Sequence, residues 1–544
     1  MSGERSVDRR SFVKLAGGAA AAVSLAGCGG GGDGNGGNGN GNGNGGNGNG
    51  EGNGDDMGPD VPEDFPVTIT QGQPPTTLDP QNHRSTPTDN VVLHVYEGVL
   101  GRSADGEIEQ NLASGFERVE DGLIRFDIRE DVTFHNGEAL TPEDVAYSIN
   151  RVVQEDVGLS PSPQRDQLAG VTGASVVDGE RAVEVESDGL NPVVFSLFGS
   201  YCDIMQRSWV ESGDNDPATE MNGTGPFQLS SYEEGVEVVM ERYDDYWGGP
   251  ATVSELTFRS AEQAGTRVNQ LLEGETDVVV NVPPQEVSRV RDSGSASIAA
   301  AASSRVIFNG MRYDVEPFSS REFRQAMNYA VDLNAIIENV LDTFGDPTGQ
   351  PTLEGFVGYN GDIDPYPADQ AQAEQLVDDS GHAGVEIELH TPVGRYLKDV
   401  EIAQAVASQI DELSNVSCSV NQRDFSALAG EVTDGDITTS PPFYLLGWGN
   451  ATFDASQTIL PLLTSDGALT SFSNEEVDET MASAQSEGNR EQRQQLLAEA
   501  NQLLHEQAPW VYLNRQYSVY GISSRLDWEA RSDERIDAYA MSQA

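Results

Sequence analysis

The stretch Val385-Glu386-Ile387-Glu388-Leu389-His390 predicts a short β-strand, and two further patterns follow it closely. Residues 396–413 carry a helical pattern, and residues 416–420 are again strand-like. Outward from this stretch the alternation continues, with β-like runs at 256–259, 277–282 and 443–446 and helical patterns at 368–380 and 490–507. Because strands alternate with helices, the sequence predicts an α/β architecture.

Helix-capping residues predict where two further helices begin. Thr141-Pro142-Glu143-Asp144 has the order of an N-cap, a proline at the first helical position and an acid two residues later, so a helix should run from there to about Val153. Ser319 and Glu322 have the spacing of a capping box. One helix is expected to follow and to end at Phe344-Gly345. Region 98–208 is richer in hairpin signals and predicts a β-heavier insertion.

The charge of the chain excludes one broad class of function. Its 544 residues include 89 acidic and 31 basic side chains, for a net charge of −58, and only Lys14 and Lys398 are lysines. So acidic a surface repels phosphate backbones, which argues against nucleic-acid binding. The excess of carboxylates with almost no lysine resembles proteins of extremely halophilic archaea, because concentrated salt screens the repulsion. An ordinary acidic secreted protein is the alternative.

The N-terminus has the pattern of an export signal followed by an anchor. Arg9-Arg10 precedes the apolar stretch Leu15–Ala26, which is too short to span a bilayer, and together they resemble a twin-arginine signal over residues 1–27. Leu25-Ala26-Gly27-Cys28 resembles a lipobox, so Cys28 is predicted to carry lipid. Residues 29–54 contain 16 Gly and 8 Asn without an apolar side chain, and predict a flexible tether over 28–64.

No combination of residues predicts catalysis, a cofactor or a metal site. The six histidines are scattered, and His135 precedes the turn signal Asn136-Gly137, which favours a strand-end role. The nucleophile, zinc and phosphate-loop motifs are not found, so the sequence does not predict an enzyme. Cys202 and Cys418 are expected to be two buried small residues, with a disulfide between them left open.

An ordered series of segments resembles one known family, the solute-binding proteins of peptide and nickel ABC importers. The match covers about residues 65–540. The segments that carry it are Thr77-Leu78-Asp79-Pro80, Tyr96-Glu97-Gly98-Val99-Leu100, Phe126–Gly137 with Thr141–Val145, Asn222-Gly223-Thr224-Gly225-Pro226-Phe227, Tyr243–Trp247, Pro317–Asp332, Leu446-Gly447-Trp448 and Ala508-Pro509-Trp510-Val511.

The resemblance implies a two-lobed periplasmic-binding-protein fold with an extra subdomain inserted in lobe I. Lobe I would comprise residues 65–97, 209–304 and 509–540, the inserted subdomain residues 98–208, and lobe II residues 305–508. The chain would cross between the lobes near Ser304-Arg305 and near Ala508–Tyr512. A monomer tethered to the outer face of the membrane would close on a ligand and deliver it to the permease subunits.

The predicted ligand contacts also come from the resemblance. Trp448, with Gly447 and Asn450, is expected to line the cleft, together with Ser304 and Tyr512 at the two crossings. Arg395 matches an arginine that binds the ligand carboxylate in dipeptide-binding relatives, and a guanidinium suits bidentate carboxylate binding. The usual acidic partner of the ligand ammonium is replaced by Ala451, so Asp454 is the nearest candidate. A peptide is therefore the predicted ligand.

Other functions stay open at this point. Within the same family the alternatives are an oligosaccharide or a nickel chelate, of which the scattered histidines make nickel the weaker. Outside the family, a surface glycoprotein or a secreted hydrolase would be the alternative. The sequence shows no internal repeat for the first and no nucleophile with a base for the second.

Overall fold

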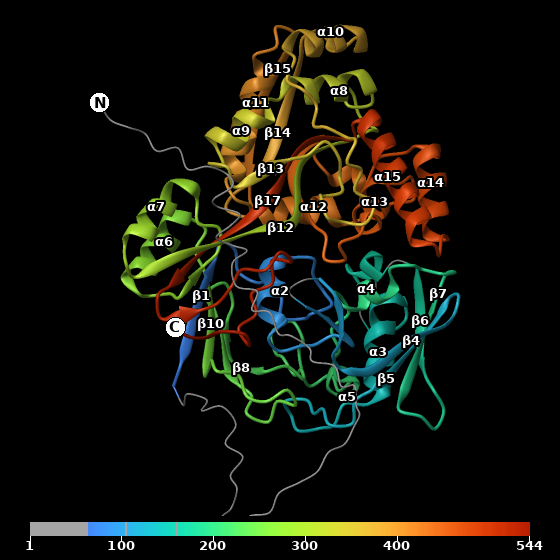
Figure 1. The fold of residues 1–544 in the computed structure, drawn as a ribbon, viewed down its shortest axis with the longest axis vertical. Helices are drawn as coiled ribbons and strands as arrows, with labels where there is room; N and C mark the ends of the chain where they lie inside the picture. The colour runs from blue at the N-terminus through green and yellow to red at the C-terminus, as the bar shows by residue number, and fades with distance from the viewer. Residues whose placement is uncertain (1–63, 104–105, 159–161, 169) are drawn as a thin grey trace, which may run out of the picture. The chain divides into compact units, whose positions relative to one another are not determined.

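The largest sheet of the protein has eleven strands and runs through most of the folded body (Figure 1). The computed structural model describes residues 64–103, 106–158, 162–168 and 170–544. The predicted export signal 1–27, the lipidation site Cys28 and the tether up to residue 63 lie outside the described residues. Within the described ranges, no helix is both long and apolar enough to cross a membrane.

Two long antiparallel strands, β12 (Ala296–Met311) and β17 (Trp510–Ser523), form the centre of this sheet. Their register shifts between Ala302 and Val306, so β12 bulges there, opposite residues 515–517 of β17. The bulge contains Ser304-Arg305, where the first crossing between lobes was predicted. The second was predicted near Ala508–Tyr512, at the start of β17; the residue of β17 opposite the bulge is Gln516, between the paired residues Arg515 and Tyr517.

Strands on either side of this centre build the two ends of the sheet. Toward lobe II they are β16 (Phe443–Gly449), β14 (Val385–Pro392) and β15 (Val416–Arg423), with β13 (Gly345–Pro347) on β17. Toward lobe I they are β11 (Val278–Val279), β1 (Pro66–Gln71), β10 (Glu255–Ser260), β9 (Glu237–Arg242) and β8 (Phe227–Glu233). The short pair β18 (Leu526–Asp527) and β19 (Ser542–Gln543) lies near the C-terminus. The predicted runs 256–259, 385–390, 416–420 and 443–446 fall on these strands, whereas of the run 277–282 only Val278–Val279 forms a strand.

Helices pack against both ends of the sheet. The lobe I end has α2 (Thr86–Val92), α6 (Ala264–Glu273) and α7 (Pro284–Asp292). The helices between β12 and β17 are α8 (Arg321–Ala330), α9 (Leu333–Asn339), α10 (Gln370–Ser380), α11 (Asp399–Asp411), α12 (Phe425–Thr433), α13 (Ala455–Leu463), α14 (Glu475–Gln485) and α15 (Arg490–Gln507), with a 3₁₀ turn at Ile437–Thr439. The alternation with strands confirms the α/β class.

One helix prediction was wrong in two respects. The segment after residue 320 forms two helices instead of one, because the Asp332 side chain accepts a hydrogen bond from the backbone N–H of Ala335 and begins α9. The N-cap of α8 is Ser320, whose side chain accepts from the N–H of Phe323, and not Ser319. The capping-box spacing to Glu322 had pointed to Ser319, but the helix begins one residue later.

Residues 98–208 contain a second sheet with its own hydrophobic core. Its four strands, in spatial order, are β4 (Ala113–Glu120), β5 (Leu123–Ile128), β7 (Ala182–Ser187) and β6 (Val171–Val176). The remaining elements of this part are β2 (Leu100–Arg102), β3 (Ile108–Gln110), α3 (Pro142–Val153), a 3₁₀ turn at Arg165–Leu168 and α4 (Val194–Phe198), followed by α5 (Arg207–Glu211). The predicted start of α3 is confirmed, since Thr141 and Asp144 form a reciprocal capping box.

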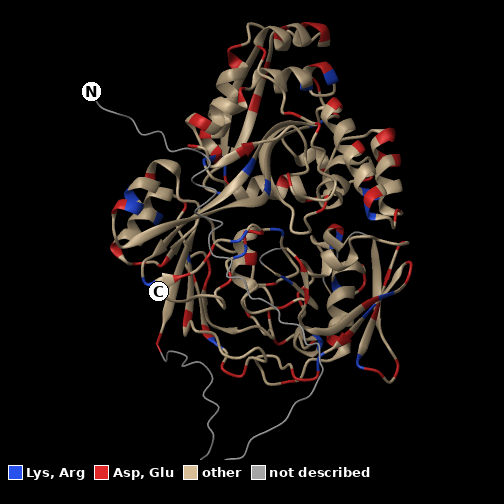
Figure 2. Cartoon of the chain, viewed as in Figure 1, with Lys and Arg blue, Asp and Glu red and all other residues tan. Residues whose placement is uncertain are grey.

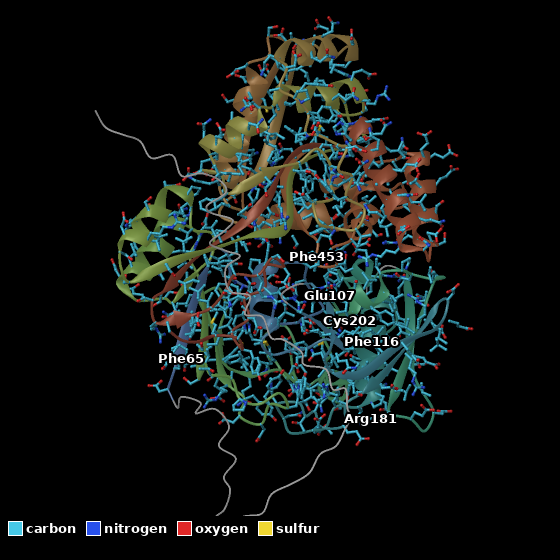
Figure 3. All side chains as sticks on the ribbon, viewed as in Figure 1. Phe65, Glu107, Phe116, Arg181, Cys202 and Phe453 are labelled. Atoms are coloured by element: carbon cyan, nitrogen blue, oxygen red, sulfur yellow. The ribbon has the colours of Figure 1, made fainter. Side chains whose placement is uncertain are left out.

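The inserted part and lobe II meet at Phe453. The ring centroid of Phe453, labelled in Figure 3, lies 5.3 Å from Cζ of Arg102, and a Cβ at Gly106 would lie 3.4 Å from Cε2 of Phe453. The two cysteines that were considered as a pair are both free, with Cys202 buried and Cys418 half-buried. The expectation of two buried residues is therefore confirmed for Cys202 only.

Candidate ligand-binding site

Three adjoining pockets lie where α2 meets the bulge of β12. The central pocket, of about 120 Å³, is lined from lobe I by Asp89 and Asn90 and from lobe II by Arg305 and Trp448. An inner pocket of about 30 Å³ shares Asn90 with it and contains Arg395. A third pocket of about 220 Å³, which we call the lobe I pocket, shares Asp89 and Asn90 with the central one. The shared residues show that the three pockets adjoin one another.

The guanidinium of Arg395 lines the inner pocket without a counter-ion. The residue is only 8% exposed, and its Nε has no hydrogen-bond acceptor within the part of the chain that the structure describes. Its Cζ lies 4.8 Å from the ring centroid of Tyr396 and 5.3 Å from that of Phe425. Burial, and next the nearby Arg305, lower the pKa of Arg395. A buried cation in this state is costly unless an anion enters the pocket.

A carboxylate holds the loop that carries Arg395. Asp399, at the first position of α11, accepts hydrogen bonds from the backbone N–H groups of Arg395 at 2.8 Å and Tyr396 at 3.0 Å, and a longer one from Gly394. Burial raises the pKa of Asp399 to about 6. These bonds fix the backbone on both sides of Arg395, so the position of its side chain is set by α11.

Two lobe I side chains bind the same loop from the opposite side. Nε2 of Gln73 donates to the carbonyl oxygen of Val393 at 3.1 Å, and Nδ2 of Asn281 donates to that of Arg395 at 3.0 Å. The loop belongs to lobe II by sequence. The pocket around Arg395 is therefore built by both lobes.

A buried ion pair forms the wall between the inner and central pockets. Arg305 and Glu534 are each 7% exposed at the side chain, with Nη2 of Arg305 2.5 Å from Oε2 of Glu534. Nη1 of Arg305 also donates to the carbonyl oxygen of Gly447 at 2.8 Å. Burial favours the neutral carboxyl, but the Arg305 guanidinium holds the pKa of Glu534 below its usual range. Both charges are thus retained and paired.

Three of the predicted site residues lie on the central pocket. Trp448 lies half-buried on β16, and its Nε1 is buried without an acceptor among the described residues. A Cβ at Gly447 would meet Cδ1 of Ile307 at 2.6 Å, so glycine is required there for packing. Ser304 contributes through its backbone, donating to the carbonyl of Ser532 and accepting from the N–H of Asn450. With Arg395 in the adjoining pocket, four predicted residues come together.

The other three predicted residues line none of these pockets. Asp454 is bound by Arg493 of α15 at 2.5 and 2.9 Å and caps α13 through the N–H of Ser456. The prediction that Asp454 meets a ligand amine is therefore not retained, because its oxygens already have partners. Asn450 is buried in the same turn, where Nδ2 donates to the carbonyl of Asp454.

Tyr512 is also a core residue in the structure. Its hydroxyl donates to the carbonyl oxygen of Leu504 at 3.0 Å, and its side chain belongs to the hydrophobic cluster of lobe II. The sequence predicted Tyr512 at a crossing between the lobes, but its side chain is buried and lines none of the three pockets. Its side chain consequently points away from the pockets, among residues such as Trp510.

Sequence reasoning missed several charged residues of the site. Glu534 and Arg535 lie in a charged segment near the C-terminus, and Asp89 and Asp203 lie far from any motif that predicts ligand contact. The only available signal was Arg305, an arginine immediately before the apolar run Val306-Ile307-Phe308. An arginine at the start of a buried strand requires a carboxylate partner, but the spacing does not identify which one.

Comparison with known proteins gives the family of the chain. The sequence model described as "Bacterial extracellular solute-binding proteins, family 5 Middle" matches residues 107–470. The chain belongs to this family. Family 5 proteins are the extracytoplasmic substrate-binding components of ABC importers and are not enzymes. The alternative of a secreted hydrolase is thereby excluded.

Individual family 5 relatives bind chemically different ligands. The glutathione-binding protein GsiB of Salmonella typhimurium is 22% identical over 85% of this chain and 91% of its own length. DppA of Helicobacter pylori, solved with the peptide STSA, aligns with a TM-score of 0.80 at 17% identity, over 88% of this chain and 99% of DppA. NikA of Staphylococcus aureus, solved with Ni(L-His)2, gives a TM-score of 0.77 at 16% identity, over 88% and 100%. These structures confirm the two-lobed fold.

Proposed function

We propose that this family 5 protein captures peptides in the pockets between its lobes and delivers them to the permease of an ABC importer. The single observation that carries the peptide assignment is the buried guanidinium of Arg395, which lines the inner pocket without an ion pair of its own among the described residues, since Glu534 of the same pocket is paired with Arg305. A carboxylate terminus supplies the missing charge and the planar acceptor geometry that a guanidinium binds best. We infer that the lobes close on the bound peptide.

The pockets support a neutral oligosaccharide or a nickel chelate as the ligand less well than a peptide. A neutral oligosaccharide would leave the Arg395 charge buried and unpaired, at a cost of several kcal/mol. For a nickel chelate, no group of three or more His, Cys, Asp or Glu side chains in the described ranges is placed to hold a metal ion, although the chelator could supply all ligands itself. Peptides thus fit the charges of the site best.

We further propose that the protein works as a lipid-anchored monomer at the outer face of the membrane of a halophile. The support comes from the sequence: the twin-arginine pattern, the lipobox with Cys28, and the Gly/Asn-rich tether. Acidic residues far outnumber basic ones over the whole described body, as Figure 2 shows. The inserted part 98–208 is proposed as a subdomain of lobe I.

Calorimetric titration in molar KCl tests the ligand class. The probes are alanine peptides of two to five residues with a free C-terminal carboxylate, the same peptides as C-terminal amides, maltotriose, and the nickel–histidine complex. We expect binding of at least one free-acid peptide and loss of that binding in its amide. Binding of maltotriose or nickel–histidine without binding of any peptide would replace the peptide assignment.

A further inference from the structure

The lobe I pocket is the largest of the three pockets and lies apart from lobe II. All residues that line it belong to residues 89–111, 198–246 and 531–539, so none comes from 305–508. It adjoins the central pocket, with which it shares Asp89, Tyr201 and Arg535. A ligand held in the central pocket therefore lies next to this second space.

Asp203 lies in the wall of the lobe I pocket without a counter-ion. The residue is 9% exposed, and no ion pair or hydrogen bond from another residue of the described ranges reaches its carboxylate. It directly follows Cys202, which Figure 3 labels, and its backbone pairs with Gly98. An ionised carboxylate in so buried a position is expected to have a cation or several donors around it.

A second carboxylate of the same pocket, Glu97, has hydrogen-bond donors at both of its oxygens. Glu97 accepts hydrogen bonds from Oγ1 of Thr224 at 2.8 Å, the hydroxyl of Tyr246 at 2.9 Å and Nε1 of Trp247 at 3.0 Å. Glu97 therefore needs no ligand. Asp203 lines the same pocket but accepts none of these hydrogen bonds, so it is the acid available to bind a ligand.

The arginines of this pocket are already engaged with other groups. Arg531 pairs with Asp533 at 2.6 Å, and Arg102 donates to the carbonyl of Ser196. Arg535 donates to the carbonyl of Ser200 at 3.2 Å and lies within electrostatic range of Asp203 without forming an ion pair with it. Since a protein cation does not neutralise Asp203, the position is open to a cation from outside.

The remaining walls suit an organic cation. Four tyrosines line the pocket, and their ring faces attract ammonium groups by cation–π interaction. Burial raises the pKa of Asp203 to about 7, so about half of the carboxyls are protonated at neutral pH, and a bound cation favours the ionised form. We propose that the lobe I pocket is an amine subsite, in which Asp203 binds the free amino group of a ligand whose carboxylate binds Arg395.

This inference rests on the proposed peptide function and adds the group that recognises the other end of the peptide. The test is calorimetry in molar KCl at pH 8 with alanine peptides of two to five residues, each with a free or an acetylated amino end. The proteins are the wild type, Asp203→Asn, and the control Asp245→Asn, which changes an exposed aspartate of lobe I. Asp203→Asn preserves the size of the side chain, and circular dichroism checks its fold.

For peptides that reach the pocket, we expect N-acetylation to lower the affinity by about 30-fold or more, both in the wild type and in the Asp245→Asn control. In Asp203→Asn, free and acetylated peptides should bind equally. If Asp203→Asn still discriminates between free and acetylated peptides as the wild type does, the assignment of the amine subsite is wrong, while the proposed peptide function stands. If the wild type binds none of the peptides, the proposed function itself fails.

A measurement on the wild type alone covers the case in which the variant does not fold. The affinity for free-amine peptides should fall as the pH is lowered from 8 to 6, because protonation removes the charge of Asp203. The affinity for acetylated peptides should stay the same over this range. Arg535, Asp89 and Glu97 are the other charged or titratable groups that act on Asp203. Equal pH dependence for both peptide forms would overturn the assignment.

Discussion

Arg305 and Glu534 form a buried ion pair although 229 residues separate them in the chain. Arg305 lies in the bulge of β12, and Glu534 belongs to the C-terminal segment and lines both the inner and the central pocket. The pair therefore joins the crossing strand to the end of the chain. It also gives the ligand pockets a neutral wall, because each charge cancels the other.

Breaking this pair should destabilise the protein strongly. Glu534→Gln leaves the Arg305 charge buried and unpaired, so we expect the free energy of unfolding to fall by about 3–5 kcal/mol in denaturant titrations at constant KCl. The control is Glu237→Gln, which removes a carboxylate from the exposed pair with Arg259 and should cost at most about 1 kcal/mol. Equal effects of both variants would show that the buried pair has no special role.

Replacing Arg395 should weaken peptide binding without lowering the stability of the ligand-free protein. Arg395→Ala removes the proposed carboxylate partner, and we expect peptide affinity to fall roughly 30- to 5,000-fold in calorimetry. Because the guanidinium is buried without an anion, the ligand-free variant should be no less stable than the wild type. Arg289→Ala, at an exposed pair with Glu286, is the matched control. Wild-type affinity in Arg395→Ala would contradict the peptide assignment.

The raised pKa of Asp203 predicts how stability depends on pH. Between about pH 4 and 7 the folded protein keeps the proton on Asp203 while the unfolded chain has lost it, so stability should decrease as the pH rises through this range. Asp203→Asn removes this contribution. At pH 8 and without ligand, the variant should be more stable than the wild type, by at most about 4 kcal/mol. Parallel stability–pH curves for the two proteins would show that Asp203 is paired in solution.

The anchor prediction concerns Cys28. Cys28→Ala should leave the folded body intact and release it from the membrane into the medium, because the lipid attached to Cys28 is the proposed membrane anchor. Cell fractionation after a wash in concentrated salt measures the outcome, and Cys418→Ala is the control that leaves the lipobox unchanged. A Cys28→Ala protein that stays in the membrane fraction would mean that another segment anchors it.

The charge of the chain predicts a dependence on salt. Removal of residues 1–27 deletes four basic and two acidic residues, which leaves a net charge of −60. Dilution from molar salt to ~0.1 M lengthens the Debye length from ~3 to ~10 Å and restores repulsion among the carboxylates. Circular dichroism should then show loss of structure that KCl prevents. An unchanged signal over this range would argue for an ordinary acidic secreted protein.

The elements that the sequence predicted well are those specified by neighbouring residues. The start of α3 at Thr141 follows from a capping box of four residues, and α15 was predicted with its bounds at 490–507. Where two local signals competed, the prediction was wrong: Asp332 caps a new helix inside a stretch whose apolar spacing suggested one helix. Caps and periodicity act over a few residues, which is why they can be recognised without the fold.

The sequence by itself determined the α/β class, the family, and Arg395 and Trp448 as candidate ligand contacts. Only the tertiary structure decided which charges are free to meet a ligand. Asp454 is paired with Arg493 and Arg305 with Glu534, whereas neither Arg395 nor Asp203 forms an ion pair within the described residues. The physical reason is that ion pairing depends on distance in space, and the partners lie 39 and 229 residues apart in the chain.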